Sequence, residues 1–368
     1  MSDVVHLLPA AATAAPPRPA GRARAHRQTS SYTELAREVR AAGLLARRRG
    51  WYLGRMGAAV GALAVVVAAA VLLRDSWLVL LPAAALALVL TQCAFLGHDG
   101  AHRQMFTSAR ANEWAGRTFA SLCCGLSHGW WLGKHTRHHQ GPNQRGLDGD
   151  VESKVLSFTP EAARDRRGAL AWLTRRQGYA FFPLLLLQGL NLHVDSTSRL
   201  LDRAPLRRRP LDAALVATHW VVYLALLLLL LGPGRGAAFL GVHLAVFGVC
   251  MGLAFAPNHV GMPVVPRGGD VDFLRRQVLV SRDVRGGALV DLVMGGLNFQ
   301  AEHHLFPSMP RPHLRRAQEL VRAHCAREQV PYTETSFLGA YRAVVGHLHE
   351  VGLQARPTFS CPVAAGLR

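Results

Sequence analysis

The sequence has 368 residues, of which 50% are hydrophobic and only 18% carry a charged side chain, against about 25% in ordinary soluble domains. Lys and Arg (42) exceed Asp and Glu (23), so the formal net charge is +19. The low charged fraction argues against an ordinary cytosolic enzyme. The arginines lie between long apolar runs, which favours anionic lipid or an acidic protein as a partner over nucleic acid.

The first 50 residues are rich in Ala, Pro and Arg and contain no apolar core of a signal peptide. We expect residues 1–50 to be a disordered basic tail and lead-in, residues 51–350 to form one membrane domain, and residues 351–368 to be a C-terminal tail. The six cysteines have no CxxC spacing. They therefore indicate a reduced cytosolic or intramembrane setting, not a disulfide scaffold or a zinc ribbon.

Four apolar runs of 18–21 residues are long enough to cross a bilayer. They are residues 56–73, 77–97, 213–231 and 237–256, and short turns join the first to the second and the third to the fourth. The sequence therefore predicts four transmembrane helices in two hairpins. Residues 179–193 are also apolar, but at 15 residues they are short for a span, and we expect an interfacial or partly inserted helix there.

The basic residues predict how these spans are oriented. Lys and Arg number 10 before residue 56, 17 in residues 98–212 and 13 after residue 256. By the positive-inside rule, both termini and the central segment are expected to be cytoplasmic. The Ala-, Gly- and Arg-rich composition is typical of a GC-rich bacterial genome, so we expect the bacterial plasma membrane as the location.

Histidines gather in three boxes and one further doublet, each in a segment expected to be cytosolic. The first box, HDGAH, contains His98 and His102, and the second, HTRHH, contains His135, His138 and His139. The third, QAEHH, contains His303 and His304, and Asn258-His259 follows the fourth apolar run. Imidazoles at helical spacing share one face, so the boxes predict a metal site.

Eight imidazoles are more than one tetrahedral zinc requires, and two metals with about four nitrogen ligands each fit the number better. Imidazole suits iron, zinc and copper alike, so the spacing alone leaves the metal open. The HExxH motif of zinc proteases does not occur in the sequence.

The motifs HDxxH, WWxxKHxxHH with a downstream DGDV, and LNFQxEHHLFPxMPR resemble those of integral-membrane fatty acid desaturases. Gln300 at the start of the third box and the Asn258-His259 pair resemble the front-end and acyl-CoA type. The resemblance implies an all-α integral membrane protein whose cytosolic helical cap holds a di-iron site. It also implies O₂-dependent insertion of a cis double bond into an acyl chain, held in a hydrophobic tunnel between the spans.

Carried over residue by residue, the resemblance makes eight histidines the iron ligands: His98, His102, His135, His138, His139, His259, His303 and His304. Asn258 and Gln300 would make weaker or water-mediated contacts. Asp99, Asp150 and Glu302 are candidate acceptors for the free ring N–H groups, with helix capping or loop solvation as the alternative.

Each turnover needs two electrons from outside, and the HPGG haem motif of fused cytochrome b5-like domains does not occur in the sequence. We therefore expect a separate electron carrier, a ferredoxin or a cytochrome b5 type with its reductase. The acyl group could be carried by CoA, a carrier protein or a lipid. Arg145, Arg311 and Arg315 could bind an anionic head group, but we expect them to belong to an ordinary basic surface.

Two alternatives remain open at this point. A hydroxylase or ketolase could use the same scaffold and would leave an oxygen atom from O₂ in the product. A histidine-rich metal transporter would instead place polar ligands midway through several spans. His219 and His243 do lie inside apolar runs, where we expect them to serve helix packing, and the role of His193 is open.

Overall fold

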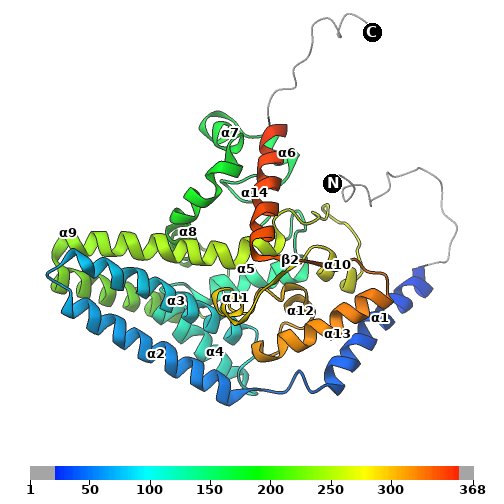
Figure 1. Ribbon diagram of the computed structural model, residues 1–368, viewed down its shortest axis with the longest axis horizontal. Coiled ribbons are helices and arrows are strands. Elements are labelled where there is room, and N and C mark those ends of the chain that lie inside the picture. The colour runs from blue at the N-terminus through cyan, green and yellow to red at the C-terminus, as the bar shows by residue number, and fades with distance from the viewer. Residues whose placement is uncertain (1–20, 356–368) are drawn as a thin grey trace, which may run out of the picture.

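The computed structural model describes residues 21–355, with side chains from residue 31 onward. The chain is mostly helical, as expected, and three of its helices are long and apolar enough to cross a membrane: α2 (Arg49–Leu72), the segment Trp77–Ala101 that contains α3 (Leu80–Ala101), and α9 (Arg209–His259). Figure 1 shows these helices as roughly parallel rods, with the shorter elements gathered at one end. The number differs from the four expected because the last two apolar runs form the single element α9.

The element α9 reverses direction at Gly232, which has non-helical backbone angles (φ 69°, ψ 176°). The hydroxyl of Tyr223 lies 2.8 Å from Nδ1 of His243, 20 residues further on. On a straight helix these residues would be about 30 Å apart. The two parts of α9 on either side of Gly232 therefore lie side by side, and a left-handed glycine permits the turn.

The remaining elements build a cap around the ends of the long helices. Between α3 and α9 the chain forms α4 (Ala109–Arg117), the π-helical turn η2 (Thr118–Cys123), α5 (His128–Gln140), α6 (Pro160–Arg164), α7 (Gly168–Thr174) and α8 (Gln177–Leu201). After α9 come α10 (Phe273–Leu279), β1 (Arg282–Arg285), α11 (Ala288–Val293), α12 (Gln300–Leu305), α13 (Leu314–Arg327), β2 (Thr333–Ser336) and α14 (Phe337–Gln354). Short 3-10 turns, η1 (Trp77–Val79) and η3 (Arg311–His313), precede α3 and α13.

The fold is not purely α, since β1 and β2 form a two-stranded parallel sheet with Arg282 opposite Thr333. Val284 of β1 is buried in a small cluster with Met294 and Ala340. This pairing joins two cap segments that are about 50 residues apart in the sequence, which local patterning does not reveal.

Within residues 1–50, expected to be a disordered basic tail and a lead-in, the structure describes residues 21–50 and contains a helix there. Helix α1 (Gly21–Ala41) lies against α13 (Figure 1). Leu35, Val39 and Leu44 are buried there beside Leu274 and Val321. The apolar residues at positions 35 and 39 share one helix face, and burying them against the cap stabilises the segment. The rest of the expected tail, residues 1–20, and most of the expected C-terminal tail, residues 356–368, lie outside the described residues.

A separate apolar core lies between the long helices, where Leu86 and Leu90 of α3 pack against Phe239 and Phe247 of α9. A cavity of about 390 Å³ opens among α2, α3 and α9, and its lining is mainly aliphatic. His219 and Tyr223 are among the few polar side chains that line it. The protein therefore has an apolar space in its membrane-spanning half and a polar centre in the cap.

Candidate metal centre

The histidine boxes meet at the cap end of the long helices. The first box lies at the end of α3, the second on α5 and the third on α12, and His259 is the last residue of α9. Every one of the eight rings has its centroid within 5 Å of another ring in the set. Four segments that are distant in the sequence therefore bring their imidazoles into one buried cluster.

Four of these histidines form a first group: His98, His102, His135 and His303. Their ligand nitrogens all lie within 4.8 Å of one another. Nε2 of His98, His102 and His303 is buried and has no hydrogen-bond partner among the described residues. Buried polar atoms almost always have a partner, and convergent imidazole nitrogens without one fit a metal ion.

His138, His259 and His304 form a second group, again with ligand nitrogens within 4.8 Å. The amide nitrogen of Gln300 lies 2.9 Å from Nε2 of His259 and 2.8 Å from Nε2 of His304. Nε2 of both imidazoles therefore faces the same small amide donor. Asn258 donates to Oε1 of Gln300 at 3.1 Å and holds the amide in this orientation.

His139 lies between the groups. Its ring centroid is 4.5 Å from that of His135 and 4.4 Å from that of His304, and its Nδ1 is buried without a partner. The expectation of about four nitrogen ligands for each of two metals compares with groups of four and three histidines here. Four histidines with His139 beside them form one group, and three histidines with Gln300 form the other.

Four of the eight rings have their second nitrogen, Nδ1, beside an acceptor. Nδ1 of His98 is 3.2 Å from Asp99 Oδ1, and Nδ1 of His138 is 2.8 Å from Asp148 Oδ2. Nδ1 of His259 lies 2.9 Å from the carbonyl of Val280, and Nδ1 of His304 lies 3.0 Å from Gln277 Oε1. These contacts fix the rings so that Nε2 faces the interior of the cluster.

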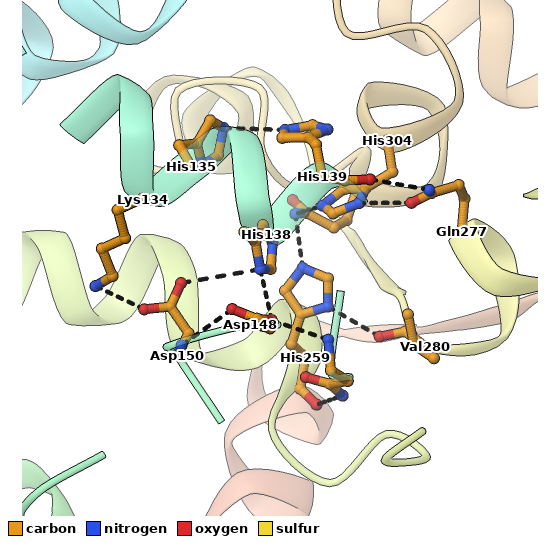
Figure 2. Close-up of polar contacts among 12 residues, drawn as sticks. Lys134, His135, His138, His139, Asp148, Asp150, His259, Gln277, Val280 and His304 are labelled. Carbon is orange, nitrogen blue, oxygen red and sulfur yellow. Dashed lines mark hydrogen bonds and ion pairs between the residues drawn. The ribbon is translucent and has the colours of Figure 1, made fainter. Parts of the chain in front are cut away.

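Both aspartates of the DGDV motif lie near His138, and Asp148 lies nearer to the ring than the expected Asp150 does (Figure 2). The side chain of Asp148 is 1% exposed, whereas that of Asp150 is 50% exposed, lies 3.8 Å from His138 and pairs with Lys134 at 2.6 Å. The path of the loop therefore brings both aspartates to His138, with Asp148 buried beside the ring and Asp150 on its exposed side.

Glu302, the third candidate acceptor, makes no hydrogen bond to a ring nitrogen among the described residues. Its Oε1 lies 3.0 Å from the hydroxyl of Tyr332, which in turn donates to Asp283 at 2.6 Å. Asp283 also accepts the backbone N–H of Ala301, which caps α12 from another element. Burial raises the pKa of both carboxyls, and the nearby Asp283 raises the pKa of Glu302 further, whereas the contact with Glu302 lowers that of Asp283. The pair therefore anchors the helix that carries His303 and His304.

Burial also sets the protonation state of the centre. It lowers the pKa of five imidazoles well below the usual range, so that at pH 7 they are neutral and present a lone pair: His102, His135, His139, His303 and His304. Burial also opposes the charged form of His138, but the contact with Asp148 outweighs it and raises the pKa. That same contact lowers the pKa of Asp148 to about 2 despite its burial.

Two buried arginines support the centre, and sequence reasoning missed both. Arg311 was expected on an open basic surface, but it is nearly buried, pairs with Asp99 and lies 5.6 Å from the centroid of the Trp51 ring. Arg117 pairs with Asp212, whose other oxygen accepts Ser127 Oγ and the backbone N–H of Gly129 at the start of α5.

The other two arginines named from the sequence are surface residues, as expected. Arg145 is half exposed and lies 3.9 Å from Glu161, and Arg315 pairs with Asp291 at 2.6 Å. The three other histidines named from the sequence contact groups outside the centre. His193 contacts the carbonyls of Gly189 and Cys124, His219 contacts the carbonyl of Leu122, and His243 contacts Tyr223.

Comparisons with known proteins agree with this geometry. Residues 75–336 match the family profile described as "Fatty acid desaturase". A Delta(8)-fatty-acid desaturase of Helianthus annuus is 30% identical over 76% of this chain and 64% of its own length, and an acyl-lipid (9-3)-desaturase of Borago officinalis is 30% identical over 72% and 62%. A Delta(6)-fatty-acid desaturase of Caenorhabditis elegans is 25% identical over 86% and 73%. The chain thus spans somewhat less than two thirds of the first two relatives, and it belongs to the fatty acid desaturase family.

Proposed function

We propose that this protein is an O₂-dependent fatty acyl desaturase. In the balanced reaction, a –CH₂–CH₂– unit of an acyl chain, O₂, two electrons and two protons give a cis –CH=CH– unit and two molecules of water. The observation that carries the proposal is the convergence of eight imidazoles from four segments into two adjacent groups. Such a donor set fits two metal ions, and the family membership points to iron.

The residues that would hold the two irons are those of the two groups. His98, His102, His135 and His303, with His139 beside them, would hold one, and His138, His259 and His304, with Gln300 nearby, would hold the other. When bound, the irons would supply the activation of O₂. The task of the protein is to keep the imidazoles neutral, to orient them through Asp99, Asp148 and Gln277, and to exclude water by burial.

The acyl substrate is supported by the apolar space between the long helices. The cavity of about 390 Å³ is lined by Leu86, Leu90 and Leu227, among others, and its volume is in the range of small-molecule sites. Several relatives carry acyl-lipid or fatty-acid desaturase names. We propose a fatty acyl chain as substrate, carried by CoA, a carrier protein or a membrane lipid.

We also propose that four segments cross the bilayer and that the metal centre faces the cytoplasm. The two parts of α9 lie side by side and are each long enough to span. All four histidine segments meet at one end of the long helices, and most of the basic residues belong to segments at that end. In a bacterial plasma membrane this places both termini inside the cell.

The electrons require a partner, and we propose a ferredoxin or a cytochrome b5 type with its reductase. The charge of +19 favours an acidic carrier, because opposite charges steer association. Arg207 and Arg208, which lie 4.0 and 3.4 Å from Glu113, are both substantially exposed and offer one docking surface for such a carrier.

The decisive experiment is expression in a host with defined fatty acids, followed by gas chromatography–mass spectrometry of its lipids. A new monounsaturated chain is expected from the wild type and not from His138→Ala or His303→Ala, while both variants still insert in the membrane. Purified wild-type protein should contain about two irons per chain. A product that retains oxygen from O₂ would identify a hydroxylase, and one equivalent of zinc would contradict the di-iron assignment.

A further inference from the structure

The helices α6, α7, α14 and the first half of α8 project from the side of the molecule (Figure 1). Within this arm, α14 packs closely against α8 at Gly178 and against the end of α7 at Gly352. A Cβ at Gly178 would lie 2.9 Å from Cβ of His349, and one at Gly352 would lie 2.5 Å from the carbonyl oxygen of Thr174. The arm is therefore a firmly packed unit whose surface has a fixed shape.

Between α8 and α14 lies a groove of about 560 Å³, remote from the metal-binding side chains. Residues 338, 342, 345 and 349 follow one face of α14 and form one wall, and Tyr179 and Phe182 of α8 form the other. Tyr179 is 75% exposed, Phe182 48% and Leu338 69%. A concave patch of large exposed apolar side chains indicates a surface that is covered by an apolar partner.

The apolar wall of the groove continues along α8 into the membrane-spanning half. Leu186, Leu190 and Val194 follow Tyr179 and Phe182 on the same helix face and are 49–53% exposed. Helix α8 crosses α9 where Gly189 meets Gly248, and Gly248 is 11 residues before the end of α9 at His259, about 16 Å along a helix. The stripe therefore lies at the depth of the spans, and the groove opens where this stripe meets the cap.

The groove also has a charge that suits one class of lipid. Arg342 is exposed in it and makes no hydrogen bond or ion pair within residues 31–355. No acidic residue lines the groove, and Arg175 and Arg176 directly precede α8 in the chain, close to Gly178 and Tyr179 of the groove. An arginine beside apolar side chains at the edge of a bilayer is the arrangement that holds a phosphate above acyl chains.

We propose that this groove binds an anionic glycerophospholipid of the cytoplasmic leaflet. Its phosphate would pair with Arg342, and an acyl chain would cover Tyr179 and Phe182 and follow the stripe of α8. The inference is independent of the proposed desaturation, since the groove contains none of the candidate metal ligands.

The test uses the full-length protein in detergent, titrated with phosphatidylglycerol or phosphatidylcholine and followed by native mass spectrometry. The wild type should retain one phosphatidylglycerol more strongly than phosphatidylcholine. Arg342→Gln should lower affinity for phosphatidylglycerol about fivefold, the size expected for one cation near an anionic surface, and should leave phosphatidylcholine binding unchanged. Gly346→Phe should weaken both lipids, because the space beside Gly346 is open and the ring would fill the groove without a clash.

Matched controls separate the groove from general effects. Arg316→Gln removes an exposed arginine of α13, and Gly57→Phe adds a ring at an open position of α2; both should bind lipid as the wild type does. Unfolding temperatures should be the same for all four variants. The proposal would be overturned if Arg316→Gln lost as much phosphatidylglycerol affinity as Arg342→Gln, or if Gly346→Phe lost none. It would also be overturned if inorganic phosphate bound as strongly as the lipid, or if the lipid-free protein formed a dimer that Gly346→Phe disrupts. None of these readouts requires turnover, so they are independent of the desaturase test.

Discussion

Replacing Asp148 with asparagine perturbs the metal centre without touching a ligand. Oδ2 of Asp148 lies 2.8 Å from Nδ1 of His138 and 2.9 Å from the backbone nitrogen of Asn143, and Oδ1 accepts the N–H of Asp150 at 3.0 Å. An asparagine side chain has only one accepting oxygen. In either orientation of its amide, the contacts of Oδ1 or those of Oδ2 are therefore lost. The charge that stabilises the N–H of His138 is lost as well.

The expected size follows from these contacts. A hydrogen bond to a charged group contributes about 1.5–3 kcal/mol and a neutral one about 0.5–1.5 kcal/mol. The change should therefore weaken the orientation of His138 by about 1.5–2.5 kcal/mol, which corresponds to a 10- to 100-fold loss of metal affinity of the kind found for residues that support metal ligands.

The assay is a chelator competition with Fe(II) under anaerobic conditions on the purified full-length protein. The matched control is Asp150→Asn, since Asp150 is half exposed, lies 3.8 Å from His138 and pairs with Lys134. Such an exposed contact contributes about 1 kcal/mol or less, so the loss should be below about fivefold. An equal or larger loss in Asp150→Asn, or unchanged affinity in Asp148→Asn, would refute the reasoning.

Three further outcomes are expected. Gly189→Ala should lower the free energy of unfolding by about 1–3 kcal/mol, because a Cβ there would clash with the carbonyl oxygen of Leu244. The control Gly241→Ala, where a Cβ meets open space, should leave stability unchanged. Equal stability of the two variants would contradict this packing. Turnover with limiting acidic ferredoxin should fall as ionic strength rises, and Arg207–Arg209 changed to Gln should raise the KM for the carrier but not for the acyl substrate; salt-independent turnover would assign the basic surface to lipid alone. A reporter fused at Gly234 should give a periplasmic signal, and reporters fused after Gly50, Leu156 and Val330 should give a cytoplasmic signal. A periplasmic signal from the fusion after Leu156 would contradict the proposed topology.

Local spacing in the sequence was sufficient to identify the family and the eight imidazoles. The HxxxH and HxxHH patterns place rings on one helix face because the α-helix has 3.6 residues per turn, and His98, His102 and His135 do converge. The apolar runs likewise predicted the long helices, since their length and composition alone suit a bilayer.

Contacts between distant segments decided the rest. Asp148 points inward because Asn143 donates to the carbonyl of His259 and Val265 pairs with the neighbouring backbone, which fixes a loop whose course no periodicity encodes. Arg311 reaches Asp99 across 212 residues of sequence.

The sequence by itself therefore determined which residue types carry the chemistry and at which ends of the spans they lie, because helix periodicity and hydrophobic length are properties of each segment alone. Only the tertiary structure decided how the imidazoles divide, with His138 beside His259 and His304, which aspartate holds His138, and that α1 covers the cap. Those features depend on how separate segments pack against one another, and packing is a property of the whole chain.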